Sequence, residues 1–162
     1  MIEKLITEMI TYFDGDIKRI NHALKVHSFS KFIGENEKLN YDDRIILEIA
    51  AILHDIGIKN SEIKYNSSNG KWQQIEGPPV AKEILQKYNV MDKVVERVCY
   101  LIAHHHDYSN IQGQDYQILI EADFLVNIYE DEFDKGSIKT VYDKYFKTET
   151  GRMYIENIYK VY

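Results

Sequence analysis

Hydrophobic residues recur at helical spacing through most of the chain. One face of the segment 2–13 carries only apolar side chains, namely Ile2, Leu5, Ile6, Met9 and Ile10. The turn-forming sequence Asp14-Gly15-Asp16 interrupts this pattern, and Asp16 can cap a second helix that runs to about Gly34. That second helix has two apolar stripes, so we expect it to be central and buried on two sides.

A third helix is predicted from near Tyr41 to His54, because it contains the apolar run IILEIAAIL and meets Gly57 shortly afterwards. Further helices are predicted at about 80–88, 92–105, 115–129, 137–146 and 150–159. The adjacent residues Pro78 and Pro79 are expected to open the first of these, where proline is tolerated.

Residues 59–75 are polar and rich in Asn, Ser and Gly, which predicts one long loop with at most a short hairpin. No series of residues alternates between apolar and polar as a half-buried strand would. The pattern therefore predicts an all-α fold, and the absence of repeats or linkers favours one domain over residues 1–162.

Composition and charge narrow the class of protein. The net charge of −6 argues against sequence-independent binding of nucleic acid duplexes, which requires a basic surface. A single cysteine, Cys99, excludes an internal disulfide and a Cys-rich zinc site. No apolar run approaches the roughly 20 residues of a membrane span, and the N-terminal segment lacks the apolar region of a signal peptide. We therefore expect a cytoplasmic protein that does not enter membranes.

Two acidic positions are candidates for chemistry. His54 and Asp55 follow the long apolar run, and their side chains can converge on one ion only where the helix ends. The alternative is that His54 simply stabilises the helix by its favourable interaction with the C-terminal end of the helix dipole. Asp123 shares a helix face with apolar residues, so burial would require a cation or a metal beside it, unless it forms a structural ion pair. The same argument applies to Glu121, which lies in the same apolar helix.

The other histidines are less decisive when taken alone. His22 and His27 lie on the two different apolar stripes of the second helix, and spacing does not choose between them. A lone histidine on an apolar face is more often a core residue than a ligand. His105 extends an apolar stripe, His104 lies on the wetter side of the same helix, and His106 is expected in the following loop.

Taken in order, these residues resemble the HD superfamily of metal-dependent phosphohydrolases. The resemblance rests on a distant His, an HD dyad after an apolar helix and a late Asp. The words NHALKV, AAILHDIG, LIAHHH and ILIEADFLVNI match its segments over about residues 16–130.

The resemblance implies an all-α core in which one metal is bound by His22, His54, Asp55 and Asp123. It favours His22 over His27, because Val26 follows His22 by four positions and 32 residues separate His22 from His54. Such a mixed nitrogen and oxygen set suits Mn, Fe, Co, Ni, Zn or Mg. His104 and His105 could bind a second ion or the phosphoryl group.

The chain departs from the family pattern at two positions. Glu76 stands where members with two metals carry a histidine, so it could be a second-metal ligand, a general acid or base, or an exposed acid near a helix start. Lys59 is separated from HDIG by Ile58, whereas some relatives have a lysine directly after HDIG near the substrate phosphate.

The implied activity is hydrolysis of a nucleotide or another small phosphate ester by metal-activated water, with Asp55 and Glu76 as the catalytic candidates. A sensor that binds a metal or a nucleotide without turnover, and a di-iron oxygenase, are the alternatives. The chain has no GYP motif after its HHH run, so the cyclic-dinucleotide branch lacks support. Trp72, Tyr65 and Lys71 could contact a nucleotide base and a phosphate. The chain could also form oligomers.

Overall fold

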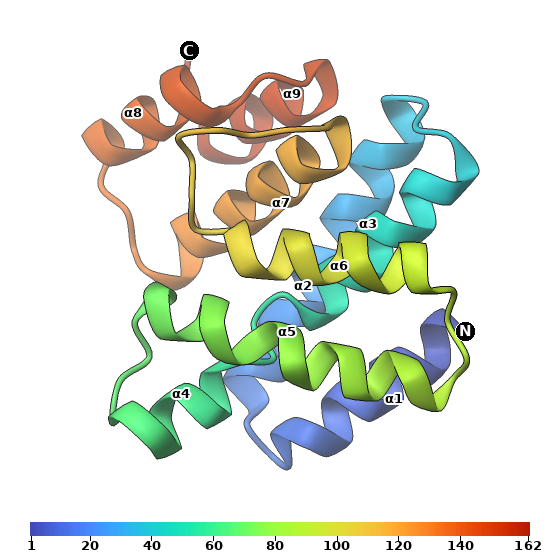
Figure 1. The fold of residues 1–162 in the computed structure, drawn as a ribbon. Coiled ribbons are helices and arrows are strands. Elements are labelled where there is room, and N and C mark those ends of the chain that lie inside the picture. The colour runs from blue at the N-terminus through green and yellow to red at the C-terminus, as the bar shows by residue number, and fades with distance from the viewer.

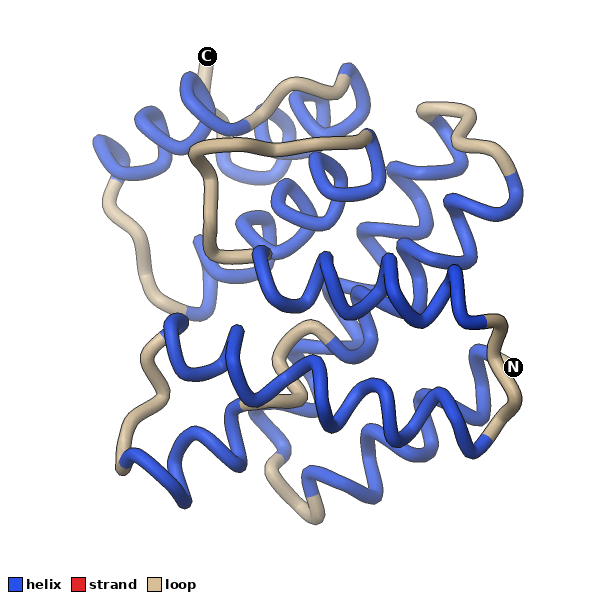
Figure 2. The backbone as a smooth tube through the Cα atoms, viewed as in Figure 1, coloured by secondary structure: helices blue, strands red, loops and turns tan.

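Nine helices and no strand make up the computed structural model, which describes all residues from 1 to 162 (Figure 2). The helices are α1 (Ile2–Phe13), α2 (Ile17–Asn36), α3 (Tyr41–Leu53), α4 (Ile58–Tyr65), α5 (Gly70–Lys87), α6 (Asp92–His104), α7 (Gln114–Glu130), α8 (Lys135–Tyr145) and α9 (Glu149–Tyr159). They contain 76% of the residues, which confirms the predicted all-α fold. No helix combines the length and the apolar character needed to cross a bilayer.

The helices α2, α3 and α7 form the centre of the molecule (Figure 1). Helix α2 packs against both α3 and α7, as its two predicted apolar stripes require, and α5 packs against α6. Helix α7 is buried over nearly its whole length, because its sequence is apolar on almost every side. One continuous cluster of 38 buried apolar residues links these helices.

The start of α2 is fixed by the predicted cap. The side chain of Asp16 accepts a hydrogen bond from the backbone N–H of Arg19 at 3.1 Å, which satisfies one free donor of the first turn. The Arg19 guanidinium pairs with Asp16 and also with Glu62 of α4. The beginning of α2, five residues before His22, is thereby tied to α4.

The prediction of a long loop at residues 59–75 is wrong. Residues 58–65 form α4, and α5 begins at Gly70, so that only residues 66–69 connect the two helices. Helix α4 buries only Ile58 and Ser61. A helix with so few buried positions has no apolar stripe in its sequence, and periodicity therefore did not indicate it. Asn66 ends α4 with φ 48°, and the Asn69 side chain caps α5 by accepting from Lys71 N–H at 2.9 Å.

The two prolines lie inside α5 and do not open it. Proline normally interrupts a helix, because it lacks an N–H and disfavours helical backbone at the preceding residue. Here the residue before Pro78 is Gly77, which has no Cβ to clash with the proline ring. Ile75 and Pro79 are exposed, so water is close to the part of the helix where the two prolines provide no N–H group.

The turn after α3 lies directly against α5. A Cβ atom added to Gly57 would be 2.5 Å from both the carbonyl oxygen of Gln73 and the amide nitrogen of Gly77. Gly77 in turn approaches Ile102 of α6. Because two backbones touch here without side chains between them, the position of the turn that contains Asp55 is fixed relative to α5.

Glu121 is a buried structural carboxylate that ties α7 to the start of α9. Its Oε1 accepts from the backbone N–H groups of Lys147 at 2.7 Å and Thr148 at 2.9 Å, and from the side chain of Gln117 at 2.7 Å. Burial raises the pKa of Glu121 above its usual value, against the effect of these hydrogen bonds. The sequence argument for a metal ligand applied equally to Glu121 and Asp123, and the structure separates them. Glu121 has hydrogen-bond donors from the protein, whereas Asp123 lies beside His22 and His54.

Candidate metal centre

Six side chains from four helices or their ends converge at the centre of the molecule. His22 comes from α2 and Asp123 from α7, while two neighbouring pairs follow helix ends, His54 with Asp55 after α3 and His105 with His106 after α6. The backbone turns from residue 54 to residue 57, which lets His54 and Asp55 point to the same place, as expected from the sequence. Five of these six side chains were candidates in the sequence; His106 was not.

The first group of donor atoms consists of His22, His54 and Asp123, with Asp55 beside them. His22 Nε2 lies 3.2 Å from His54 Nε2 and 3.1 Å from Asp123 Oδ1. Asp55 Oδ2 lies 3.5 Å from each of the two Nε2 atoms. Atoms bound to one metal at about 2.0–2.2 Å are separated by roughly 3.0–3.6 Å, so these spacings match a shared coordination sphere.

The second group consists of Asp55, His105 and His106, whose donor atoms all lie within 4.8 Å of one another. Asp55 Oδ1 is 3.4 Å from His105 Nε2, whereas its Oδ2 faces the first group. The two oxygens of one carboxylate thus face two separate sets of donors.

The histidine rings of the first group and His105 are held by hydrogen bonds that point away from the cluster. In each ring Nδ1 donates at 2.8 Å, to Glu130 Oε2 from His22, to Ala51 O from His54 and to Ile102 O from His105. Carbonyl and ionised carboxylate oxygens only accept, so Nδ1 carries the proton and, in the neutral ring, Nε2 keeps a free lone pair. The three lone pairs therefore face the cluster, as metal ligation requires.

Two buried atoms of the cluster have no hydrogen-bond partner, His105 Nε2 and Asp123 Oδ1. Such atoms are costly in a protein interior unless an ion or water satisfies them. Asp55 and Asp123 contribute two negative charges to the cluster, and a divalent cation would neutralise them. The donor set and the unpartnered atoms fit a divalent metal ion.

The two carboxylates attract positive charge strongly. Burial lowers the pKa of His22, but Asp123, Asp55 and Glu130 outweigh it and raise that pKa to about 9. Burial raises the pKa of Asp55, but His54, His105 and His22 outweigh this effect and hold the pKa well below its usual range. A metal ion would take the place of protons on the imidazoles.

A cavity of about 300 Å³ opens onto the cluster and is lined almost entirely by polar residues. Besides His22, Asp55, His106 and Asp123, its wall includes Lys18, Ser68, Gln73 and Asn127. Lys18 is exposed and forms no ion pair with another side chain, so its ammonium group is free to meet an anion. The wall suits a small, charged molecule.

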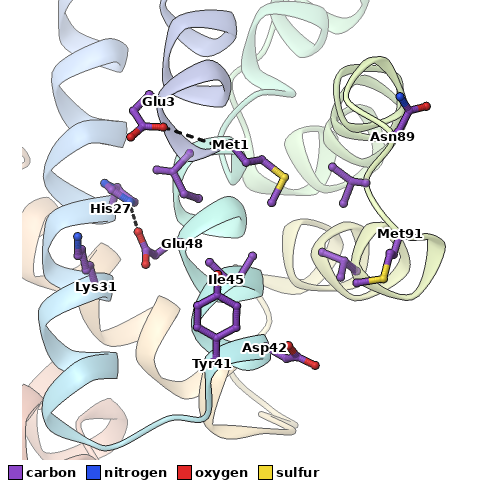
Figure 3. A pocket seen from close by; sticks show the side chains of 13 residues that line it. Met1, Glu3, His27, Lys31, Tyr41, Asp42, Ile45, Glu48, Asn89 and Met91 are labelled. Carbon is purple, nitrogen blue, oxygen red and sulfur yellow. Dashed lines mark hydrogen bonds and ion pairs between the residues drawn. The ribbon is translucent and has the colours of Figure 1, made fainter.

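A larger cavity, about 760 Å³, lies between the N-terminus, α2, α3 and the α5–α6 connection (Figure 3). His27 is in its wall, and His27 Nε2 lies 2.9 Å from Glu48 Oε2. His27 therefore has a carboxylate partner away from the cluster of donor atoms, and the structure brings His22, not His27, to His54 and Asp123.

His104 and Lys59 do not reach the cluster. His104 Nδ1 donates to Tyr100 O at 2.7 Å, and its ring stacks on that of Tyr100 with centroids 4.2 Å apart. Lys59 Nζ donates to the backbone oxygen of Tyr12 at 2.9 Å. Neither residue lines the cavity beside the cluster, so their expected contacts with a second ion or a phosphate lack support in this geometry.

Glu76 is buried inside α5 and is not an exposed acid at a helix start. Its carboxylate accepts from Lys64 Nζ at 2.6 Å and from Tyr65 OH at 3.0 Å, which connects α4 to α5. The Lys64 ammonium lowers the pKa of Glu76 despite the burial of the carboxyl group. Glu76 belongs to neither group of donor atoms and does not line the polar cavity.

Two contributors to this centre were not found from the sequence. His106 lies in the loop after α6, as the sequence predicts, but the sequence does not reveal that it packs against Gly70 with its Nε2 3.1 Å from Gln73 Oε1. Glu130 follows Asp123 by seven residues, two helical turns on the same face of α7, and this spacing was its only signal in the sequence.

The comparisons with known proteins agree with this geometry. The HD domain family matches residues 19–146. A crystal structure described as a predicted HD superfamily hydrolase, from an uncultured Thermotogales bacterium, is similar in fold, with a TM-score of 0.72 and 23% sequence identity. The alignment covers 98% of this chain and 84% of that one. No curated protein matches the sequence. Because the family match spans most of the chain and includes every residue of the cluster, the protein belongs to the HD domain family.

Proposed function

We propose that this protein is a metal-dependent phosphohydrolase that acts on a small phosphate ester, such as a nucleotide. The observation that carries the proposal is the convergence of imidazole lone pairs and two carboxylates at the end of a polar cavity. Membership of the HD domain family supports the same type of hydrolase.

His22, His54, Asp55 and Asp123 would hold one divalent ion, and Asp55, His105 and His106 would hold a second. Such an ion supplies Lewis acidity for a phosphoryl oxygen and lowers the pKa of water near it. The donor set suits Mn, Fe, Co, Ni, Zn or Mg. Asp55 has the central place in this assignment, because its two oxygens face the two groups.

The chain's own residues would bind and orient the ester. Lys18 can pair with a phosphate oxygen at the cavity wall, while Asn127 offers a neutral amide to the rest of the substrate. A local cation is useful here because the net charge of −6 repels an anionic substrate at a distance.

The aromatic residues of the α4–α5 connection do not offer free faces to a nucleotide base. Tyr65 and Trp72 stack on each other, with centroids 4.0 Å apart, and Lys71 lies over the Trp72 ring. The polar cavity itself contains no aromatic side chain other than His22 and His106. Recognition of the phosphate group therefore carries more of the proposal than recognition of a base.

The role of general acid or base that the sequence analysis considered for Glu76 is tested by Glu76→Gln. Because Lys64 and Tyr65 occupy the carboxylate, we expect the variant to keep its metal and to lose less than about tenfold in kcat. A general acid or base would instead cost about 10²–10⁴-fold with the metal retained. The measurement is metal content and kcat on the same preparations, with Glu83→Gln, an exposed acid of the same helix, as the control.

The proposed function is tested by metal analysis of protein purified without added metal, followed by assays with each metal restored. The panel contains nucleotides, other phosphomonoesters and phosphodiesters, and we expect phosphate ester hydrolysis with at least one divalent ion. Metal binding without hydrolysis of any ester would favour the sensor. Bound iron with turnover that depends on oxygen would favour the oxygenase.

A further inference from the structure

Glu130 connects the outer side of His22 to a lysine. Its Oε2 accepts from His22 Nδ1 at 2.8 Å, and its Oε1 accepts from Lys25 Nζ. The side chain of Glu130 is only 11% exposed, whereas that of Lys25 is 46% exposed. Both oxygens of the carboxylate are thus occupied, one by each partner.

Among the three rings whose Nδ1 points away from the cluster, His22 alone has a carboxylate as acceptor. His54 and His105 each donate to the backbone carbonyl of the residue three positions earlier in the chain. A carboxylate fixes the same tautomer as a carbonyl does, and its charge also makes Nε2 a stronger donor to a metal. Helix α7 therefore supplies one of the proposed ligands, Asp123, and a carboxylate that contacts another, His22.

We propose that Glu130 is a positioning residue that keeps the proton of neutral His22 on Nδ1 and its lone pair on Nε2, with Lys25 holding the carboxylate in place. The assignment rests on the proposed metal site. It goes beyond the ligands themselves, because Glu130 contacts no donor atom of the cluster except through the His22 ring.

The alternative is that Lys25, Glu130 and His22 only connect α2 to α7. Glu130→Gln separates the two roles, since the amide keeps the size of the side chain but has one oxygen and one NH2 group. Lys25 can only donate and takes the oxygen. The NH2 group then faces His22 Nδ1 and favours the tautomer with the proton on Nε2. A protonated Nε2 has no lone pair to give to a metal in the cluster.

The experiment measures zinc affinity by competition with a chelating indicator for the wild type, Lys25→Met, Glu130→Gln and the double variant. We expect Glu130→Gln to weaken zinc binding by about 10–100-fold. Lys25→Met alone should have a small effect. The double variant should bind zinc more tightly than Glu130→Gln, because an amide released from Lys25 can turn its oxygen towards His22.

Glu132→Gln, an exposed acid just beyond α7, is the matched control, and circular dichroism reports folding. Wild-type affinity in Glu130→Gln would overturn the assignment, as would a double variant that binds zinc no more tightly than Glu130→Gln, since a purely structural link predicts cumulative losses. A wild type that binds no zinc or other divalent ion would overturn the metal site together with this role. Zinc binding without ester hydrolysis would contradict only the proposed reaction.

Discussion

Asp55→Ala is expected to remove both the bound metal and the turnover. The carboxylate faces both groups of donor atoms, with Oδ2 3.5 Å from His22 and His54 and Oδ1 3.4 Å from His105. Alanine has no donor atom, and no neighbouring side chain can bring a negative charge to the same place. Loss of several kcal/mol of metal-ion catalysis corresponds to a decrease in kcat/KM of at least about 10³-fold.

The measurement is metal content by elemental analysis, together with kcat/KM on the best ester of the panel. Glu48→Gln is the control, because it changes a carboxylate that also pairs with a histidine, His27, but lies in the other cavity. The control should keep its metal and its activity. Full activity in Asp55→Ala would contradict the proposed function and favour a binding protein.

Gly57→Ala is expected to destabilise the fold by about 3 kcal/mol, since extra atoms in a well-packed interior usually cost about 1–3 kcal/mol and occasionally more. The added Cβ would lie 2.5 Å from two backbone atoms of α5, and backbone cannot move aside as a flexible side chain can. For a chain of this size the loss corresponds to a decrease in Tm of about 6–12 °C.

Thermal unfolding followed by circular dichroism measures this effect. Gly136→Ala is the control, because its Cβ would meet only the side chain of Asp134, at 3.2 Å, near the exposed start of α8. The control should change Tm by no more than about 2–4 °C, the shift for 1 kcal/mol. A Gly57→Ala protein as stable as the wild type would show that the turn and α5 can separate at little cost.

The parts of the fold with an apolar stripe were predictable from the sequence. Helices α1, α2 and α3 lie close to their predicted ranges, and Asp16 caps α2 as expected. The segment 58–76 was not predictable in this way, because α4 buries few side chains and is held by polar contacts such as those of Arg19 with Glu62 and of Lys64 with Glu76. Periodicity does not record contacts of that kind.

In the candidate site, too, the residues within apolar patterns were predictable and those held by tertiary polar contacts were not. His54, Asp55 and Asp123 stood out because polar groups interrupt apolar runs, and the structure brings them together with His22. The choice of His22 over His27 came from the family resemblance, because both lie on apolar stripes. His106 and Glu130 act at helix ends through tertiary contacts with Gln73 and His22, and a one-dimensional pattern does not contain those contacts.

The donor atoms of the cluster come from residues as far apart in the chain as 22 and 123. An unfolded chain cannot keep these groups together, so an ion that binds them binds the native state alone. Ligand binding of this kind raises the free energy of unfolding by about 2.7 kcal/mol when the free ion is at 100 times its Kd. The supply of metal in the surroundings would then set how long the protein persists as a folded molecule, in addition to how fast it works.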